Sequence, residues 1–466
     1  MTNSIYSKIQ ETFGSQPRDG SKQGALWHRR REIEGRLSQL ISARSQNVCV
    51  DGPTGSGKSS VALTMLSTIG QPFVWIPVYN RMSWADFCEE IVIKYRGSQG
   101  GGRSRKSVSL EIDSAKPLAG GELINPLKLL DRLTFAAKDA GAKVSEARKA
   151  ARDWKIADVE GFIDASGHCL LIDDFEKAPD PLVQAIADLC KRLTTRPVPK
   201  CIIIGTGDTF ARLYQADEGL DGRLAELPVA SFGNDREVWN YLNDGFDRLD
   251  FDNPRSLLRS KLITKGEADS LEMAFYEAAD GMPKYINELG VRICEKVLDE
   301  SNPGRRVRVS PTVAVSQAEL MLQENLSRCN KRIRDVEVEL RKSLELRFVL
   351  RAIFKIGANG VHGVDRLVRF VIASEDEHFS YDQFVAGFER LRKLGLYVQT
   401  GKSGEVIFAK DPMFSHVLGL ICSDPNRFGK DPNVFGLVGQ RSFPLLESTS
   451  PQRAAPLLSP PLEEKE

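Results

Sequence analysis

A glycine-rich segment that follows a short apolar run is the strongest constraint on how this chain folds. Residues 52 to 59 read Gly-Pro-Thr-Gly-Ser-Gly-Lys-Ser, and they directly follow Val48-Cys49-Val50. Glycines at these positions let the backbone fold tightly and point its N–H groups at one anion. Residues 59 to 66 have a helical pattern, which places the positive end of a helix dipole beneath that anion. Strand, loop and helix together predict a phosphate-binding loop, for which a plain glycine-rich turn is the alternative.

The loop predicts a nucleotide site with distinct roles for its residues. Lys58 is expected to reach the β- and γ-phosphates, and the Ser59 hydroxyl is expected to coordinate Mg²⁺. The residues that we assign to nucleotide binding are Gly52, Pro53, Thr54, Gly55, Ser56, Gly57, Lys58, Ser59 and Ser60.

Length, charge and cysteine usage limit the classes of protein that remain. A chain of 466 residues is too long for one compact core, and its 64 basic and 63 acidic residues nearly cancel. Any basic surface for nucleic acid must therefore be local. Eight cysteines are scattered singly, which is typical of buried thiols in a reducing cytoplasm and not of a disulfide or zinc framework. No signal peptide or membrane-spanning run is evident, so we expect a cytoplasmic protein with no membrane contact.

Short apolar runs alternate with helical patterns over the first half of the chain. This alternation predicts an α/β three-layer domain with a parallel sheet. A Gly/Ser/Lys/Arg-rich stretch at 97 to 108 interrupts it and is expected to be a mobile loop. The expected strands are 48–50, 73–78, 169–176 and 201–206, and the expected helices are 27–44, 59–66, 126–153, 156–165 and 181–193.

Acidic residues end the apolar run that starts at Cys169. At the tip of a strand next to the phosphate loop, Asp173 would hold Mg²⁺ through its water shell. Asp174 would then orient or deprotonate the attacking water, although its short side chain predicts slow hydrolysis. Glu176 is the fallback base; on a continued strand it would project to the same face as Asp174, further out. For Glu176, a surface acid is the favoured interpretation.

Four later residues are candidates for completing the site. Thr206 ends its strand and could touch the γ-phosphate or the lytic water, or be a turn residue. Arg223 could act on a neighbouring subunit's site as an arginine finger, or be an ordinary surface residue. Pro283 is placed near the start of a helix, and Lys284 in its first turn could contact a phosphate or be solvated.

These motifs together resemble those of AAA+ P-loop ATPases. The resemblance covers about residues 27 to 300 and is greatest for the branch of origin-recognition ATPases, STAND-type signalling ATPases and transposon ATP-binding proteins. It rests on five segments: Gly52–Ser59, Leu170–Glu176, Ile202–Asp208, Arg223 with the following Leu-Pro, and the turn Gly281-Met282-Pro283. It implies ATP and Mg²⁺ as cofactors, the Walker A and Walker B motifs, a helical lid whose proline lies against adenine, and a homo-oligomer in the ATP state.

Two departures from the family pattern stand out. The stretch between Lys58 and Asp173 is longer than the family's usual core, so 97–155 looks like an insertion. Lys284 stands where an arginine is common, and lysine cannot form the planar bidentate contact. The expected parts are a helical lead-in (1–45), the nucleotide-binding core (46–232), a helical lid (233–300), a linker helix (301–342), a winged-helix-like domain (343–422) and a Pro/Ser-rich, mostly disordered tail (423–466).

The expected C-terminal domain consists of three helices and a hairpin. The helices are predicted at 343–356, 362–373 and 379–394, and the hairpin strands at 396–399 and 405–408. This order resembles a winged helix, which would place the third helix in the major groove of duplex DNA. Its Arg390, Arg392 and Lys393, and Lys402 on the wing, would lie near phosphates. A protein-docking or structural role is favoured, because Asp382 and Glu389 share that helix and no base-reading set is evident.

Three functions remain open from the sequence. In the first, ATP closes the lid and exposes an oligomerisation surface, and slow hydrolysis resets a switch that controls a protein partner. In the second, an ATP-bound oligomer sits on duplex DNA, as in replication initiation or transposition. In the third, the chain is a nucleotide-binding scaffold without hydrolysis. The relatives suggest a setting in antiviral defence or mobile elements.

Overall fold

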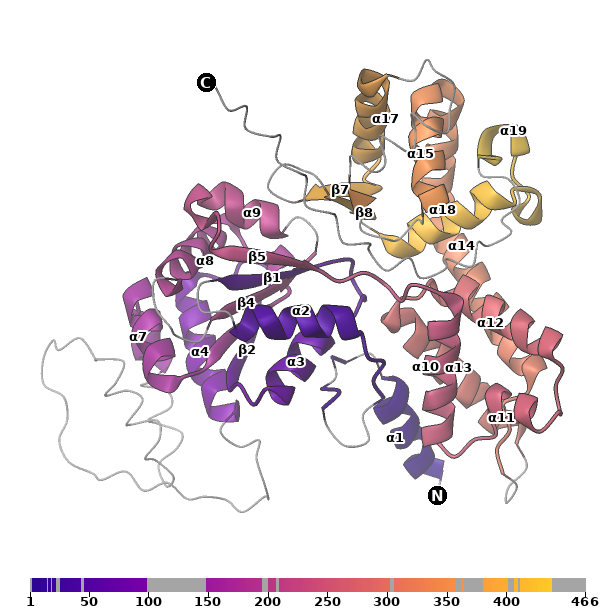
Figure 1. Cartoon of the computed structure of the whole chain (residues 1–466), viewed down its shortest axis with the longest axis horizontal. Helices are drawn as coiled ribbons and strands as arrows, with labels where there is room; N and C mark the ends of the chain where they lie inside the picture. Colours follow the sequence, from indigo (N-terminus) through magenta and orange to yellow (C-terminus); the bar gives the residue numbers. More distant parts are fainter. Residues whose placement is uncertain are drawn as a thin grey trace, which may run out of the picture.

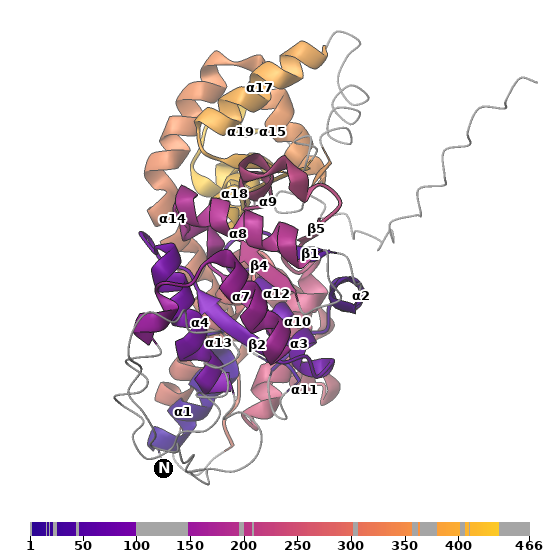
Figure 2. The same ribbon diagram turned by 90° about the vertical axis from the view of Figure 1, so that its left-hand side faces the viewer.

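The chain folds into an α/β core, a helical lid and a C-terminal module that stands above the lid (Figures 1 and 2). The structure is a computed structural model. It describes residues 2–14, 16–17, 19–21, 26–42, 46–98, 148–194, 200–206, 209–301, 306–356, 362–363, 380–400, 406–409 and 411–437.

A five-stranded parallel sheet forms the centre of the core. Its order is β2-β3-β4-β1-β5, and every neighbouring pair is parallel. The carboxyl ends of the strands therefore share one edge, where polar groups from different strands meet. The strands are β1 (Asn47–Asp51), β2 (Phe73–Pro77), β3 (Cys169–Asp173), β4 (Cys201–Gly205) and β5 (Leu224–Pro228).

Helices cover both faces of this sheet, which confirms the predicted three layers. Helices α2 (Arg31–Ser42) and α3 (Lys58–Thr68) pack on one face through Leu37, Val61 and Leu66. The other face is covered by α4 (Trp84–Ser98), α7 (Ile156–Ser166), α8 (Asp180–Leu193) and α9 (Thr209–Ala216), which the short helix η2 (Glu218–Leu220) follows. Because both faces of the sheet are buried, the sequences of β1, β3 and β4 are nearly continuous runs of apolar residues.

Three boundaries in the core differ from the predicted ones, and one strand was not predicted. Strand β3 ends at Asp173, and the chain turns into a 3-10 helix, η1 (Phe175–Lys177), so Glu176 does not lie on a strand. Helix α2 begins only at Arg31, which leaves residues 27–30 outside it. Strand β5 was not predicted, because its five residues include Glu226 and end in proline. Helix α4 reaches Ser98 where a loop was predicted at 97–108, and 99–147 lies outside the described residues.

Four helices form the lid, and the N-terminal helix packs against them. The lid contains α10 (Asp235–Arg248), α11 (Pro254–Arg259), α12 (Lys265–Ala279) and α13 (Pro283–Glu300), and the N-terminal helix is α1 (Thr2–Phe13). Phe13 is buried in the lid core, against Gly245 of α10 and Gly290 of α13. A Cβ added at either glycine would lie within 2.5 Å of the Phe13 ring. Helix α1 thus belongs to the lid by packing.

One long helix, α14 (Pro311–Lys342), joins the lid to the C-terminal module. Ala314, Ala318 and Met321 lie in the lid core, whereas Ile333 and Leu340 lie in the core of the module. The module contains α15 (Leu344–Ile356), β6 (His362–Gly363), α17 (Tyr381–Lys393), β7 (Tyr397–Thr400), β8 (Val406–Ala409), α18 (Pro412–Ser423), η3 (Asn426–Phe428) and α19 (Pro432–Phe435). Its three strands form an antiparallel sheet of order β6-β8-β7, which includes the predicted hairpin.

The C-terminal module corrects two predictions. Residues 362 and 363, predicted as the start of a helix, form strand β6, and 364–379 lies outside the described residues. Residues 424–437 were predicted as the start of a disordered tail, but Val434 and Phe435 are buried in the core of the module. Pairing with that core orders the segment, and the remaining tail lies outside the described residues.

All eight cysteines are buried and carry free thiols. Among the described helices, none is both long enough and apolar enough to cross a membrane.

Candidate nucleotide-binding site

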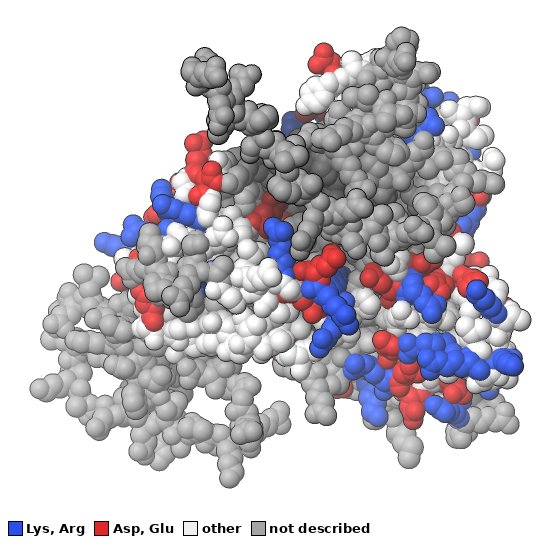
Figure 3. Space-filling model, in the orientation of Figure 1, with Lys and Arg blue, Asp and Glu red and all other residues white. Residues whose placement is uncertain are grey.

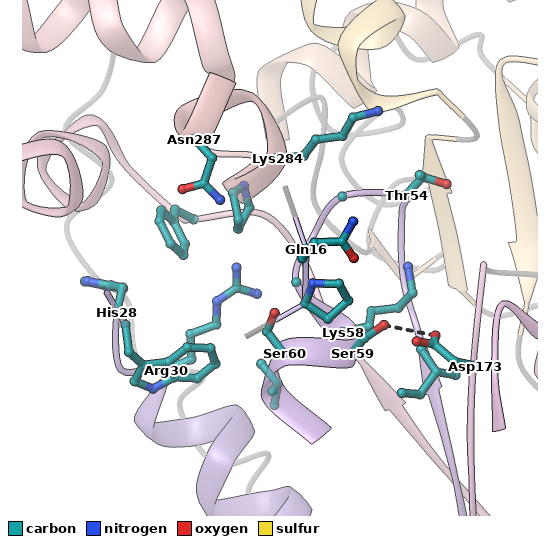
Figure 4. A pocket seen from close by; sticks show the side chains of 18 of the residues that line it. Gln16, His28, Arg30, Thr54, Lys58, Ser59, Ser60, Asp173, Lys284 and Asn287 are labelled. Atoms are coloured by element: carbon teal, nitrogen blue, oxygen red, sulfur yellow. Dashed lines mark hydrogen bonds between the residues drawn. The ribbon is translucent and has the colours of Figure 1, made fainter. Parts of the chain in front are cut away.

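A cavity of about 400 Å³ lies where the carboxyl edge of the sheet meets the lid (Figure 4). Its floor is the predicted phosphate-binding loop with the start of α3. One wall consists of residues that follow β3, a second of the first turns of α13, and a third of the segment that precedes α2. The segment before α2, the core and the lid therefore enclose one cavity, although they are distant in sequence.

The phosphate-binding loop is held in a tight conformation that glycine permits. A Cβ on Gly52 would lie 2.2 Å from the carbonyl oxygen of Val229. Gly57 has a left-handed φ of 89° and forms the N-cap of α3. The Lys58 Nζ donates to the carbonyl oxygens of Gly52 and Pro53, at 2.9 and 2.8 Å. Burial lowers the pKa of Lys58, and nearby carboxylates oppose that change.

The other predicted loop residues fall at different depths. Ser56 is fully buried beneath the loop, whereas Thr54 is exposed at the mouth of the cavity. Gly55 lies directly under the lid, because a Cβ there would be 2.9 Å from the Cβ of Lys284. Ser60 is half-buried and lines the cavity. The loop therefore presents both its backbone and its helix N-terminus to the same space.

Ser59 and Asp173 form the predicted magnesium pair. The Ser59 hydroxyl donates to Asp173 Oδ1 at 2.9 Å (Figure 4). The backbone N–H of Asp174 donates to the same oxygen, and the Trp75 indole donates to Asp173 Oδ2 at 3.1 Å. Burial raises the pKa of Asp173, and the hydrogen bond from Ser59 opposes that rise. A hydroxyl and a carboxylate held together are the oxygen donors that Mg²⁺ prefers, so these residues fit the ion.

Asp174 and Glu176 both line the cavity, but their surroundings differ. Asp174 adopts a left-handed conformation with φ 56°, and Lys177 Nζ donates to its Oδ2 at 2.6 Å. Glu176 lies within η1, two residues further along the chain. The two candidate bases are therefore on a turn that leaves the sheet.

The lid turn sits directly on the phosphate-binding loop. Pro283 begins α13, and the Lys284 N–H donates to the Gly55 carbonyl at 3.3 Å. Gly281 precedes this contact with φ 65°, and a Cβ there would lie 2.4 Å from the Phe232 carbonyl oxygen. The Lys284 side chain points away from Lys58 in Figure 4, and its Nζ lies 5.5 Å from the centre of the Tyr285 ring. In this arrangement Lys284 contacts the loop through its backbone and its first side-chain carbons.

Two predicted site residues lie apart from this cavity. Thr206 is half-buried just beyond β4, and it is not among the described residues that line the cavity. Arg223 precedes β5 at the amino edge of the sheet, because Leu224 pairs with Asn47 and Pro228 pairs with Asp51. A whole strand therefore separates Arg223 from the phosphate-binding loop of its own chain.

The segment before α2 supplies cavity residues that the sequence analysis placed inside a helix. Arg30 lies 4.8 Å over the Phe232 ring and donates to the Ala230 carbonyl at 2.8 Å. Burial lowers the pKa of Arg30 to about 10. Figure 4 shows its guanidinium pointing into the cavity from the side opposite Lys284. The only sequence signal for Arg30 was the run Trp-His-Arg-Arg-Arg. The sequence pattern predicts that these basic residues belong to the amphipathic helix that follows.

Two lid residues complete the same wall. Tyr241 of α10 and Asn287 of α13 are both buried, and the Tyr241 hydroxyl donates to Asn287 Oδ1 at 2.9 Å. This bond fixes the orientation of the carboxamide at the rim of the cavity. Neither residue belongs to a motif, so no local pattern marks them.

No protein-family profile and no curated protein matches the sequence. Similar solved structures include a Walker-type ATPase of Pyrococcus abyssi, with 15% identity and a TM-score of 0.44 over 86% of this chain and 98% of that chain. They also include Cdc6p from Pyrobaculum aerophilum, with 13% identity and a TM-score of 0.38 over 90% of this chain and 97% of that one. The Aeropyrum pernix ORC2 protein has 13% identity and a TM-score of 0.42, over 87% and 96%. At such low identities and scores, the function of this chain has to be inferred from its own residues.

Proposed function

We propose that this chain is an ATP-binding, slowly hydrolysing switch of the AAA+ or STAND type. The observation that carries the proposal is a continuous series of contacts from the phosphate-binding loop through the lid turn to the C-terminal module. Gly55 touches Lys284 at one end of this series. Contacts of His416 in α18 with Asp280, and of Arg427 in η3 with Glu277, lie at the other. Nucleotide at the loop could therefore bias the position of the module.

A buried histidine joins the C-terminal module to the lid turn. His416 of α18 places Nδ1 2.7 Å from Asp280 Oδ1 and Nε2 2.8 Å from the Glu277 carbonyl oxygen. Each ring nitrogen therefore lies within hydrogen-bond distance of its own partner. His416 and Asp280 are only 3% and 2% exposed. Asp280 immediately precedes Gly281, so a change in the turn would move this buried polar contact.

A second ion pair strengthens the same junction. Arg427, which lies in η3 beyond α18, donates to both carboxylate oxygens of Glu277 at 2.8 Å. Such bidentate pairs are geometrically demanding, so they favour one relative position of the two parts. In this proposal the junction is docked in one nucleotide state and released in the other.

When bound, Mg²⁺ would neutralise charge that develops on the β- and γ-phosphate oxygens. In this proposal, the loop N–H groups and Lys58 bind the phosphates, and Ser59 with Asp173 hold the ion. Arg223 would act in the site of a neighbouring subunit, because the sheet separates it from its own.

Light scattering coupled to size exclusion tests the switch. Wild type and Lys58→Ala are compared with ADP, with a non-hydrolysable ATP analogue, and with the analogue plus duplex DNA. Assembly with the analogue alone, lost in the mutant, supports the switch. A monomer under all conditions leaves a nucleotide-binding scaffold and removes the proposed role of Arg223.

A DNA-binding ATPase is the second candidate, and the helix and hairpin of the C-terminal module favour it. Helix α17 beside the β7–β8 hairpin is the order expected of a winged helix. However, Arg390 pairs with Glu339 at 3.3 Å, and Arg392 pairs with Glu389 at 3.5 Å. On the face in Figure 3, Lys and Arg alternate with Asp and Glu over the lid. Assembly that requires duplex DNA in the scattering experiment would favour this candidate.

A further inference from the structure

The turn after β3 is anchored so that its two acidic residues have different surroundings. Phe175 is fully buried in the core beneath the sheet edge. The Lys177 N–H donates to the Asp174 carbonyl at 3.0 Å, and the Ala178 N–H donates to the Phe175 carbonyl at 2.9 Å. These bonds close the 3-10 turn, and they place Glu176 between two fixed residues.

Asp174 is engaged by a neighbour within this turn. Its Oδ2 accepts from Lys177 Nζ at 2.6 Å, and the two side chains are 47% and 44% exposed. This hydrogen bond raises the pKa of Lys177, which keeps the ammonium charged beside Asp174. One carboxylate oxygen of Asp174 is thus already engaged by Lys177.

Glu176 and the phosphate-binding Lys58 line the same cavity. Glu176 lines the cavity, and no hydrogen bond or ion pair engages its carboxylate within the described part of the chain. Its longer side chain also reaches further than that of Asp174.

Arg212 of α9 clamps the backbone of this turn from the other side. It donates to the Glu176 carbonyl at 3.2 Å and to the Ala178 carbonyl at 2.7 Å, and it reaches Asp180 Oδ1 at 3.2 Å. Arg212 is 23% exposed, whereas Asp180 is 97% exposed, so the two backbone bonds provide the better-defined part of the clamp. Helix α9 itself follows β4, the central strand beside β3 and β1. The turn is therefore fixed to the sheet at two points, Phe175 and Arg212.

We infer that Glu176, and not Asp174, takes the proton of the attacking water, and that Arg212 is the positioning residue for its turn. This inference rests on the proposed function. In the step, the water oxygen bonds to the γ-phosphorus while the bond from that phosphorus to the β–γ bridging oxygen breaks. The water proton passes to the Glu176 carboxylate, and the electron pair stays on ADP. Asp174 instead stabilises the turn through its ion pair with Lys177.

Steady-state hydrolysis and nucleotide binding of the full chain test whether Glu176 or Asp174 is the catalytic base. Glu176→Gln is expected to lower kcat by about 10²- to 10³-fold, whereas Asp174→Asn lowers it by less than about tenfold. Both variants should keep the Kd for a fluorescent ATP analogue. The opposite ranking, equal small effects, or a wild type that binds the analogue without turnover each overturn the inference. Failure of wild type to bind the analogue instead overturns the proposed function.

The role of Arg212 has a readout that does not depend on turnover. In Arg212→Ala, hydrogen–deuterium exchange of the nucleotide-free chain should accelerate at the amides of Lys177 and Ala178. The kcat of Arg212→Ala should fall about tenfold with unchanged KM. Arg212→Lys should recover part of that loss, because lysine restores the positive charge but not the paired N–H donors of the guanidinium. Arg192→Ala, on neighbouring α8 with an exposed partner in Asp188, is the matched control. Unchanged exchange in Arg212→Ala, or full activity, overturns the positioning role.

Discussion

At the scale of single residues, the site depends on polar atoms held in place before any ligand arrives. Lys58 is only 8% exposed and is anchored on two carbonyl oxygens of its own loop. Its ammonium therefore needs little ordering to meet a phosphate. Asp173 is similarly fixed, because three donors converge on its carboxylate.

Replacing the loop lysine should remove affinity and leave the fold intact. We expect Lys58→Met to weaken binding of an ATP analogue by about 10- to 100-fold, the value of a lost charged hydrogen bond. Isothermal titration calorimetry measures this change. Lys296→Met, which removes an exposed lysine paired with Glu300, is the control. An unchanged Kd in Lys58→Met would mean that phosphates are held elsewhere.

Magnesium dependence should trace to Asp173. EDTA is expected to weaken nucleotide binding to wild type, whereas Asp173→Asn should need about 10- to 100-fold more Mg²⁺ for the same affinity. Titration of Mg²⁺ at constant analogue concentration gives the Mg²⁺ concentration at which half of the analogue is bound. An equal concentration for wild type and Asp173→Asn would assign the ion to other ligands.

At the scale of elements, glycines permit close packing between helices of different segments. Phe13 of α1 is 1% exposed and lies against Gly245 and Gly290. Gly281 similarly lets the lid turn approach Phe232. The N-terminal helix and the lid therefore share one hydrophobic core.

Changes at the α1 contact should loosen the lid. Phe13→Ala is expected to cost about 3 to 5 kcal/mol, and Gly290→Ala about 1 to 3 kcal/mol, through a cavity and through overpacking. Urea denaturation measures both, and limited proteolysis should release α1 first. Gly266→Ala in α12, where an added Cβ meets nothing within 4 Å, should be neutral or slightly stabilising. Equal stabilities for Gly290→Ala and Gly266→Ala would argue against this packing.

At the scale of the whole molecule, α14 and the lid turn determine how the three parts are connected. Helix α14 contributes to two hydrophobic cores, which resists separation of lid and module. The contact of His416 with Asp280 adds a polar junction next to the nucleotide cavity. Together they link the module to the lid.

Breaking the buried pair should release the C-terminal module. His416→Ala removes the buried hydrogen-bond partner of Asp280 Oδ1, a change that costs about 1 to 3 kcal/mol. Small-angle X-ray scattering with ADP should then give a larger radius of gyration than for wild type. Arg341→Ala, which removes an arginine that is 51% exposed, should leave the radius unchanged. A His416→Ala radius equal to that of wild type would remove the module from the switch.

The sequence alone determined the parts whose conformation is local. The phosphate-binding loop, Ser59 and Asp173 follow from glycine spacing and from the edge of a parallel sheet, so a short stretch of chain specifies each. Tertiary structure decided the rest. Arg30 and Asn287 enter the cavity, and His416 meets Asp280, only because distant segments pack together. Such contacts depend on the free energy of burying whole helices, which no local pattern contains.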